Sequence, residues 1–376
     1  MTPAADLAAA AGRLAAGMID QLAALVARES PSSDGAALAA CADLTGRLGY
    51  DAFGYPPRRV EVGGRVHLLW RRPAARVLLL GHYDTVWPVG TLAGWPFAVD
   101  GDRATGPGAF DMKAGIVQMF AAVRLLGAPE SVAMLLTADE EVGSATSRDL
   151  IEAEARTVAA VLVGEPSAGG GRPKLARKGA ASYVLRAAGR AAHAGLEPEA
   201  GVNATLELAH QVTALPLLGD PGAGTTVTPT VLDGGTTANT VPESAGVAVD
   251  VRAWTAAEQD RVDAALRALE PVLPGASLTV AGGIHRRPLE ESSGRELLAV
   301  ARAAAAELGM VLPPPARVGG ASDGNLTAAV GIPTLDGFGA VGAHPHARGE
   351  YVNVPDLPRR AALLARTLHH LTRQGG

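Results

Sequence analysis

Residues 76–87, RVLLLGHYDTVW, decide the fold that we predict for this chain. The apolar run that ends at Leu80 is typical of a strand buried on both faces of a parallel sheet. His82 and Asp84 follow this strand at once. In an open parallel sheet the carboxyl ends of the strands share one edge, and ligands bind in the crevice beyond it. We therefore expect His82 and Asp84 to lie at a ligand-binding site.

The rest of the first half repeats this alternation of strands and helices. Further strands are predicted at Val66–Trp70, Val132–Thr137 and Ala160–Val163, and a helix at Met112–Leu126. Such an alternation predicts an α/β fold with a mostly parallel central sheet and helices on both of its faces.

The pattern changes near residue 178. Strands with alternating hydrophobicity and two helices follow in the order β-α-β-β-α-β, the signature of a ferredoxin-like α+β sandwich. The predicted strands are Ser182–Ala187, Thr225–Leu232, Gly246–Arg252 and Ser277–Val280, and the predicted helices are Val202–Leu215 and Ala256–Leu273.

After Pro288 the earlier alternation resumes, with a helix at Gly294–Leu308, a strand at Thr334–Leu335 and a closing helix after Pro358. A chain of 376 residues is long enough for two domains. We therefore predict a catalytic metal-binding domain formed by residues 1–177 and 288–376, and an inserted domain formed by residues 178–287.

Composition limits the class of protein. With 48% hydrophobic and 19% charged residues the chain is typical of a soluble globular protein, and its net charge of -5 without long basic runs argues against a nucleic-acid partner. The single cysteine, Cys41, fits a reducing compartment and a small buried side chain. Asp6, Arg13 and Asp20 interrupt the apolar N-terminus, which predicts an amphipathic helix instead of a signal peptide or a membrane span. We expect a cytoplasmic protein with no membrane partner.

Nearly all candidate metal ligands follow the ends of predicted strands. One imidazole and five carboxylates would meet in one crevice: His82, Asp84, Asp111, Glu140, Glu141 and Glu165. So many carboxylates cannot all stay ionised in a partly buried cleft without compensating cations, and imidazole with carboxylate suits zinc. Taken singly, Asp111 is also a plausible helix N-cap, and the Glu140–Glu141 pair a solvated face. Together the residues favour a site with two divalent ions.

The motifs around these residues resemble those of the M20 metallopeptidase family, and within it the glutamate carboxypeptidases of the carboxypeptidase G type. They are GHYDTV (81–86), GPGAFDMKAG (106–115), TADEEVGS (137–144), VGEPS (163–167), GRAAHAG (189–195) and HPHARGEYV (344–352). They occur in the family's order over nearly the whole chain. The resemblance implies a zinc-peptidase-like catalytic domain with an inserted dimerisation or lid domain.

The same resemblance implies a role for each site residue. His82 and Glu165 would bind one Zn²⁺, Glu141 and His346 the other, with Asp111 bridging both; Co²⁺ or Mn²⁺ can use the same ligands. Asp84 would orient the His82 ring, and Glu140 would be the general base. His346 matches the family's interval before Glu350, and His344 does not. The family also implies a cis peptide bond between Asp111 and Met112.

In the inserted domain, the resemblance assigns residues to the substrate. His193 would reach the active site of the partner subunit in a homodimer and polarise the scissile carbonyl, and Asn239 would help to bind the substrate carboxylate. Lys178, Arg252 and Arg286 are cations where the family recognises carboxylates, although each is equally able to pair with a structural acid. The sequence His285-Arg286-Arg287-Pro288 departs from the family pattern at this point.

These features predict a metal-dependent hydrolase that acts on the C–N bond of a small N-acyl amino acid or peptide. Release of a C-terminal amino acid, glutamate first, is the preferred activity, and Glu165 is the ligand type of carboxypeptidases and deacylases in this family. An N-acyl-amino-acid deacylase of the acetylornithine or succinyl-diaminopimelate type is the alternative. A non-catalytic binding relative is third, and the presence of Glu140 speaks against it.

Overall fold

The computed structural model describes residues 4–373, and the chain forms two compact units. Within these residues, unit 1 comprises 4–176, Glu291–Val318 and 322–373, and unit 2 comprises Arg177–Glu290 and Gly319–Ala321. The main segment of unit 2 starts one residue before the inserted domain expected at 178–287 and ends three residues after it. The short segment 319–321 carried no sequence signal that would assign it to unit 2.

Unit 1 is built around a six-stranded sheet in the order β1-β2-β6-β3-β7-β16. β3, β6, β7 and β16 run parallel, and β1 and β2 add an antiparallel edge. The strands are β1 Arg58–Val62, β2 Arg65–Trp70, β3 Val77–His82, β6 Val132–Thr137, β7 Ala160–Val163 and β16 Thr334–Leu335. The mostly parallel α/β sheet is as predicted. β3 extends to His82 because Gly81 and His82 still pair with Leu136 and Thr137 of β6.

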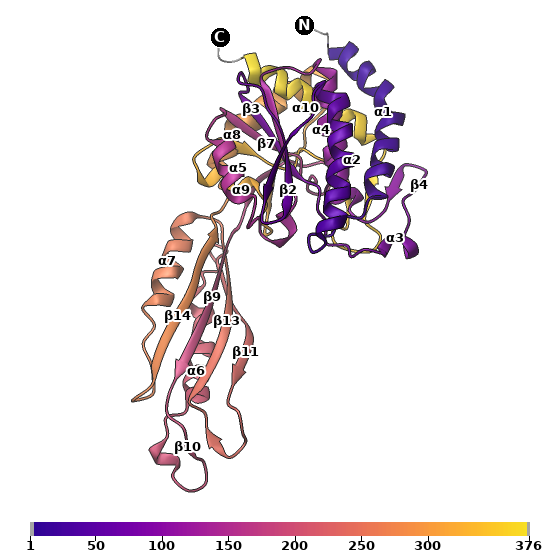
Figure 1. Ribbon diagram of the computed structural model, residues 1–376. Helices are drawn as coiled ribbons and strands as arrows, with labels where there is room; N and C mark the ends of the chain where they lie inside the picture. The colour runs from indigo at the N-terminus through magenta and orange to yellow at the C-terminus, as the bar shows by residue number, and fades with distance from the viewer. Residues whose placement is uncertain (1–3, 374–376) are drawn as a thin grey trace. The chain divides into compact units, whose positions relative to one another are not determined.

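Helices cover both faces of this sheet (Figure 1). Alternate residues of each strand serve opposite faces: Leu79 belongs to the apolar cluster of one face, and Leu78 and Leu80 to that of the other. The first face packs against α1 Ala4–Val26, α2 Gly35–Phe53, α4 Ala114–Leu125, α8 Glu291–Glu307 and α10 Asp356–Arg373, and the second against α5 Arg148–Ala155 and α9 Gly324–Ala329. Cys41 of α2 is fully buried, as expected.

Helix α1 combines an apolar composition with a buried face. Its segment Asp6–Val26 is long and apolar enough to cross a membrane by length and composition, which the prediction from interrupting charges did not anticipate. Leu7, Met18 and Leu22, however, are buried in the core, and the helix contacts α4 and α10. The burial of this face is that of an amphipathic helix packed on a globular core.

Short elements complete unit 1. A small sheet in the order β17-β18-β5-β4 brackets the loop that holds His344 and His346, and β8 pairs with β15 near the boundary of the unit. These elements are α3 Thr91–Gly94, β4 Ala98–Asp100, β5 Arg103–Thr105, β8 Lys174–Arg177, β15 Ala316–Val318, β17 Gly342–Ala343 and β18 Tyr351–Asn353.

Unit 2 is an antiparallel sheet in the order β11-β13-β9-β14 with two helices. In chain order this is β-α-β-β-α-β, so the ferredoxin-like prediction agrees with the topology. The elements are β9 Gly179–Ala188, α6 Ala204–Ala214, β11 Thr226–Gly234, β13 Ser244–Ala253, α7 Ala256–Arg267 and β14 Ser277–Arg286. α7 is shorter than the predicted 256–273, because residues 268–276, with Pro271 and Pro274, form the turn into β14.

Candidate metal centre and active site

His82 and Asp84 stand at the carboxyl end of β3, the central parallel strand. Every residue of β3 is buried, and His82 pairs in register with Thr137, the last residue of β6. This pairing brings the loops after β3 and β6 together, because the carboxyl ends of parallel strands lie at the same edge of a sheet. His82 is 1% exposed and Asp84 is completely buried.

Asp111 lies in a distorted turn, Ala109–Lys113, that precedes α4. The peptide bond from Asp111 to Met112 is cis, as the family resemblance implied. The N-cap residue of α4 is Lys113, so the alternative of Asp111 as a helix cap is wrong. The predicted helix start at Met112 is also two residues early, because this turn occupies residues 109–113.

Glu350 holds the Asp111 turn in place. Its carboxylate accepts hydrogen bonds from the backbone N–H groups of Gly108 (3.2 Å), Phe110 (2.7 Å) and Asp111 (3.0 Å). The indole N–H of Trp87 donates to the same carboxylate at 3.1 Å. Glu350 is fully buried, and burial raises the pKa of its carboxyl although the three amides counteract this.

Glu140 and Glu141 lie in a single 3-10 turn, Glu140–Val142, just after β6. Their backbone N–H groups donate to the two carboxylate oxygens of Asp84, each at 3.3 Å. The side chain of Glu141 is 6% exposed, so the alternative of a solvated glutamate pair is wrong for this residue.

Glu165 follows β7, and two glycines pack closely against the backbone just before it. A Cβ added at Gly115 would lie 2.0 Å from the carbonyl oxygen of Gly164, and one added at Gly339 would lie 2.2 Å from the same atom. Only glycine allows both segments to approach this closely. The Glu165 side chain lies 3.7 Å from the Nζ of Lys174, a cation that partly balances it.

His346 joins these residues from the loop between β17 and β18. Its Nε2 lies 3.1 Å from Glu141 and 3.4 Å from Asp111. The ring of His344 is tilted against that of Tyr351, with centroids 6.1 Å apart, and His344 belongs to neither ligand group among residues 4–373. The geometry therefore selects His346 over His344.

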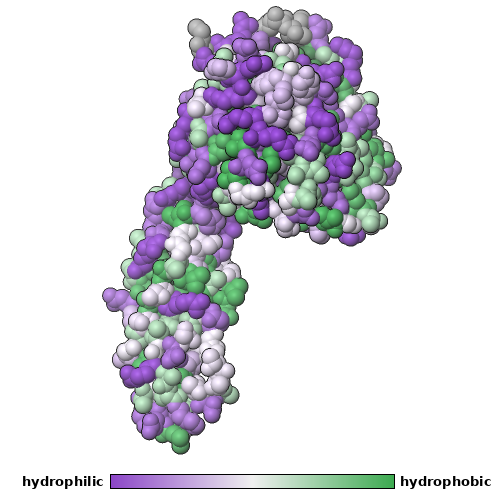
Figure 2. All heavy atoms as spheres, viewed as in Figure 1, coloured by the Kyte–Doolittle hydropathy of each residue, from purple (hydrophilic) through white to green (hydrophobic). Residues whose placement is uncertain are grey.

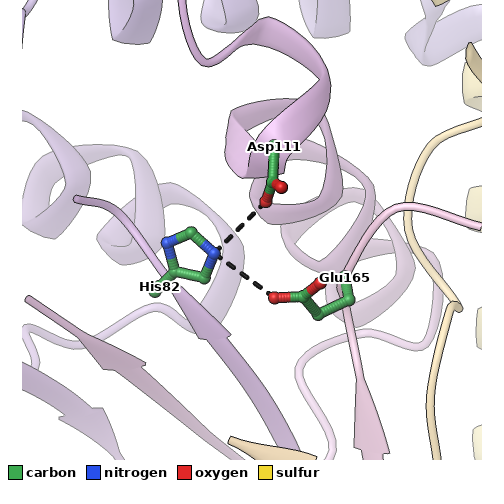
Figure 3. A group of neighbouring side chains, drawn as sticks. All are labelled: His82, Asp111 and Glu165. Atoms are coloured by element: carbon green, nitrogen blue, oxygen red, sulfur yellow. Dashed lines mark ion pairs between the residues drawn. The ribbon is translucent and has the colours of Figure 1, made fainter. Parts of the chain in front are cut away.

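Two groups of candidate metal ligands share Asp111. The first is His82, Asp111 and Glu165, drawn in Figure 3, and the second is Asp111, Glu141 and His346. The neighbouring ligand atoms are 3.1–3.4 Å apart. Ligands about 2.0–2.2 Å from a tetrahedral ion lie roughly 3.3–3.6 Å from one another. Three of the four distances lie in this range and the Glu141–His346 distance of 3.1 Å is slightly shorter, so the spacing is compatible with a tetrahedral ion in each group.

Several of these buried atoms make no hydrogen bond within residues 4–373. They are His82 Nε2, Asp111 Oδ1 and Glu141 Oε1. His82 Nε2 and Asp111 Oδ1 face each other only as an ion pair at 3.4 Å. Buried polar atoms nearly always have a hydrogen bond, so three that lack one at one point need an explanation. A divalent ion in each group supplies the missing partner, and the residues present therefore fit two ions.

The charge of the cluster leads to the same conclusion. Burial lowers the pKa of His82, but Asp111, Asp84 and Glu165 outweigh it and raise that pKa well above its usual value. Hydrogen bonds with Asp111 and Glu141 raise the pKa of His346 to about 10. Without ions, protons on the imidazoles thus compensate the carboxylates, and divalent ions would replace these protons.

The contacts of Asp84 differ in detail from those expected of a carboxylate that orients the His82 ring. The Nδ1 of His82 lies 3.0 Å from the backbone carbonyl of Asp84 and 3.5 Å from its carboxylate. The carboxylate instead accepts from the hydroxyl of Ser32 at 2.6 Å and from the two glutamate amides. The carbonyl is therefore the nearer partner of the imidazole, and the carboxylate chiefly organises the Glu140–Glu141 turn.

His193 and Asn239 are neighbours in unit 2. β10 Ala192–His193 pairs with β12 Thr240–Val241, with His193 opposite Thr240, and the N–H of Ala194 donates to the carbonyl of Asn239 at 2.9 Å. The backbone N–H groups of Gly195 and Leu196 donate to Nδ1 of His193, both at 3.1 Å. Nδ1 is thus the acceptor, and the neutral ring carries its proton on Nε2, where it can act as a donor.

The proposed substrate cations have partners inside unit 2. Arg252 forms a bidentate pair with Asp250 at 2.9–3.1 Å, which is the pairing with a structural acid that the sequence left open. Lys178 donates to the carbonyl of Gly224 and lies 5.3 Å from the centre of the Trp254 ring. Arg286 is 5% exposed. The alternative of a structural acid is realised for Arg252, whereas Lys178 has a backbone carbonyl as its acceptor. The substrate-binding role of the three cations stays a prediction.

Sequence reasoning missed Glu350, Ser32 and Lys174 as residues that support the site. Glu350 was used only as a marker for His346, although its place in the HPHARGEYV motif was an available signal. Ser32 and Lys174 lie outside the motifs, and only the fold brings them to Asp84 and Glu165.

Comparison with known proteins agrees with the family resemblance of the sequence motifs. The sequence profile of Peptidase family M20/M25/M40 matches residues 78–370. Carboxypeptidase G2 of Pseudomonas sp. (strain RS-16) is 34% identical over 313 residues, which cover 80% of this chain and 75% of that protein. A succinyl-diaminopimelate desuccinylase of Methylococcus capsulatus is 30% identical and covers 92% of this chain and 96% of its own.

Among solved structures, an aminopeptidase of Bacillus cereus ATCC 10987 superimposes with a TM-score of 0.76 at 22% identity, covering 95% of this chain and 98% of that one. At this identity the likeness establishes the fold alone.

Proposed function

We propose that this chain, which belongs to peptidase family M20/M25/M40, is a dinuclear zinc hydrolase that releases a C-terminal amino acid from an N-acyl amino acid or peptide. The chain is a metal-dependent hydrolase by its family and its curated relatives. The number and identity of the ions, the substrate and the homodimer are the proposed parts.

The observation that carries the proposal is the pair of ligand groups that share Asp111 and contain three orphaned buried atoms. His82, Asp111 and Glu165 would hold one ion, and Asp111, Glu141 and His346 the other. Bound zinc supplies a positive charge that polarises the scissile carbonyl and favours deprotonation of water. Cobalt or manganese can use the same ligands.

Glu140 is the proposed general base. It adjoins the ligand Glu141 but belongs to neither ligand group among the described residues. In the proposed reaction Glu140 accepts a proton from the attacking water, whose hydroxyl adds to the carbonyl carbon. Glu140 then returns the proton to the leaving nitrogen as the C–N bond breaks. The products are a carboxylic acid and a free amine.

Unit 2 is proposed to complete the site in a homodimer. The Nε2–H of His193 would donate to the carbonyl oxygen as negative charge develops there, and Asn239 would bind the substrate carboxylate. Unit 2 has the edge strand β11 and exposed apolar residues, among them Leu196, Val231 and Leu232. Figure 2 shows hydrophobic residues interspersed with hydrophilic ones along this unit. An edge strand and exposed apolar side chains both favour association.

Glutamate is the proposed leaving amino acid, on the strength of the likeness to carboxypeptidase G2. Arg252 already pairs with Asp250, so the preference for glutamate rests on that likeness more than on a mapped carboxylate subsite. The second candidate is an N-acyl-amino-acid deacylase. The desuccinylase relative favours it, because the match spans 92% of this chain.

A substrate panel tests the proposal. Zinc-loaded protein is incubated with N-acylated glutamate, N-acylated aliphatic amino acids, N-acetylornithine and N-succinyl-diaminopimelate, and the released amine is measured. We expect the fastest release from N-acyl glutamates. Release from the succinylated substrate alone would favour the second candidate, and the absence of release from any substrate by metal-loaded protein would refute the proposed release of amino acids from N-acyl amino acids.

Mixed dimers test the shared site. His193→Ala and Glu140→Gln chains are each expected to be nearly inactive. Random subunit exchange should restore about a quarter of wild-type activity, because about half of the dimers are mixed and each has one intact site of two. No recovery despite demonstrated exchange would mean that His193 does not act across the dimer.

A further inference from the structure

The segment that carries Glu140 and Glu141 lacks the support of regular secondary structure. β6 ends at Thr137 and α5 begins at Arg148, with only the turn Glu140–Val142 between them. Irregular backbone of this kind depends on side-chain partners to fix its conformation. The direction in which both glutamates point therefore depends on what holds the two ends of this segment.

Asp323 contacts both ends. It is 2% exposed and lies just before α9, far away in the sequence. Its Oδ2 accepts a hydrogen bond from the hydroxyl of Thr137 at 3.1 Å, and its Oδ1 accepts one from the hydroxyl of Ser144. Thr137 and Ser144 flank the glutamate pair by three residues on either side. One buried carboxylate thus bridges the base of the loop.

The loop between these ends is internally connected. The N–H of Ser144 donates to the carbonyl of Asp139 at 2.8 Å, and the N–H of Gly143 donates to that of Glu140 at 2.9 Å. The Asp139 carboxylate accepts from the N–H (2.6 Å) and hydroxyl (2.8 Å) of Thr146. A displacement of Ser144 is therefore passed through a single hydrogen bond to Asp139, the neighbour of Glu140.

We propose that Asp323 is a positioning residue for the active site: by bridging Thr137 and Ser144 it sets the orientation of Glu140 and Glu141. The inference rests on the proposed function of these two glutamates. Asp323 contacts neither substrate nor metal in this role. Its removal should misdirect the general base and one metal ligand together, while substrate binding through unit 2 is unaffected.

The chemistry of the bridge defines the variants. Asp323→Ala removes both acceptors. Asp323→Asn keeps one acceptor oxygen and replaces the other with an NH₂ group that donates. A hydroxyl can rotate to accept that hydrogen bond, so the links to Thr137 and Ser144 both survive without the charge. Glu207→Ala is the matched control: Glu207 is a fully buried carboxylate that also holds a loop, accepting from the N–H groups of Val272 and Leu273 in unit 2.

Three measurements are made on each full-length variant: the midpoint of thermal unfolding, the ions retained per chain at a fixed free zinc concentration, and kcat and KM for the best panel substrate. We expect Asp323→Ala to lower kcat roughly 10–100-fold with little change in KM, as small misplacements of reacting groups do. It should also weaken retention of the second ion. Asp323→Asn should recover most of the lost kcat and ion retention. Glu207→Ala should lower the midpoint of thermal unfolding while leaving kcat and ion retention unchanged.

The proposal is overturned if Asp323→Ala reduces kcat and ion retention no more than Glu207→Ala does, or if Asp323→Asn is as impaired as Asp323→Ala. If Asp323→Ala does not fold, Ser144→Ala and Thr137→Val each remove one end of the bridge. Both should then lower kcat and ion retention in folded protein, and unchanged values would equally refute the bridge. Ion retention requires no substrate, so it tests Asp323 even if the proposed activity fails.

Discussion

Replacement of Gly115 by alanine should damage the metal centre through backbone contact alone. A Cβ at Gly115 would lie 2.0 Å from the carbonyl oxygen of Gly164 and 3.2 Å from its carbonyl carbon. Non-bonded carbon and oxygen atoms approach to about 3.3 Å. A displacement of about 1.3 Å must therefore be absorbed between α4 and the end of β7, where Glu165 follows Gly164 directly.

The expected magnitudes follow from this displacement. Overpacking of a tight core costs about 1–3 kcal/mol of unfolding free energy. A shift of about 1 Å in a group that positions the reaction can cost about 10²-fold in rate. We therefore expect Gly115→Ala to lose stability in this range, to bind zinc more weakly in the group with His82 and Glu165, and to turn over about 10²-fold more slowly.

The matched control is Gly17→Ala in α1, where an added Cβ meets no atom within 4 Å. The same substitution there should stabilise the protein by about 0.5–1 kcal/mol, because alanine loses less entropy than glycine in a helix. Urea denaturation of metal-free protein, zinc titration and kcat measure the three effects. Gly115→Ala with wild-type stability, zinc affinity and kcat would refute the reasoning.

Three further predictions concern the base, the ions and a peripheral acid. Glu140→Gln should keep the fold and the ions but lose about 10²–10⁴-fold in kcat, and a residual rate above about a tenth of wild type would mean that another group is the base. Elemental analysis of reconstituted protein should find about two divalent ions per chain, as the charge of the cluster requires, and background metal in folded protein would contradict this. Hydrogen bonds from Arg261 and Thr225 lower the pKa of Glu258 from 4.5 to about 2, so its stabilising contribution is complete above pH 4.5 and lost as the pH falls toward 2. In urea denaturation at a series of pH values, the stability gap between wild type and Glu258→Gln should therefore close over this window, and a gap that does not change with pH would contradict it.

The sequence predicted those features that depend on periodicity or on short motifs. Buried strands such as Val132–Thr137 and Ala160–Val163 have the predicted bounds, because an apolar run between turns leaves little freedom. The strand-end rule brought His82 and Glu165 to one point although they lie 83 residues apart in the chain, and the glycine-rich motif around Asp111 added the third member of this group. Cytoplasmic location, the homodimer and the lack of a nucleic-acid partner stay predictions.

The sequence left a residue's partner open where that partner lies at a nearby strand position or is held through the backbone. Arg252 lies two residues from Asp250, so both side chains point to the same face of β13 and pair there. Arg252 considered without the alternation of its strand gives no sign of its pairing with Asp250. The helix start predicted at Met112 failed for a similar reason, since the turn of Asp111 depends on amides held by Glu350 from the other end of the chain.

The buried carboxylates of this site divide into two kinds that the sequence does not distinguish. Asp111 and Glu141 each have a carboxylate oxygen without a hydrogen bond, as does the imidazole Nε2 of His82 beside them, and these are the atoms that an ion can satisfy. Asp84, Asp323 and Glu350 accept instead from amides and hydroxyls, which fix loops. A free carboxylate atom in a buried cluster is costly unless a cation pairs with it, whereas a saturated one has no capacity left for a metal. Unpaired atoms therefore mark Asp111, Glu141 and His82 as candidate ligands, whereas Glu165 and His346 join them by closeness to the other members of each group.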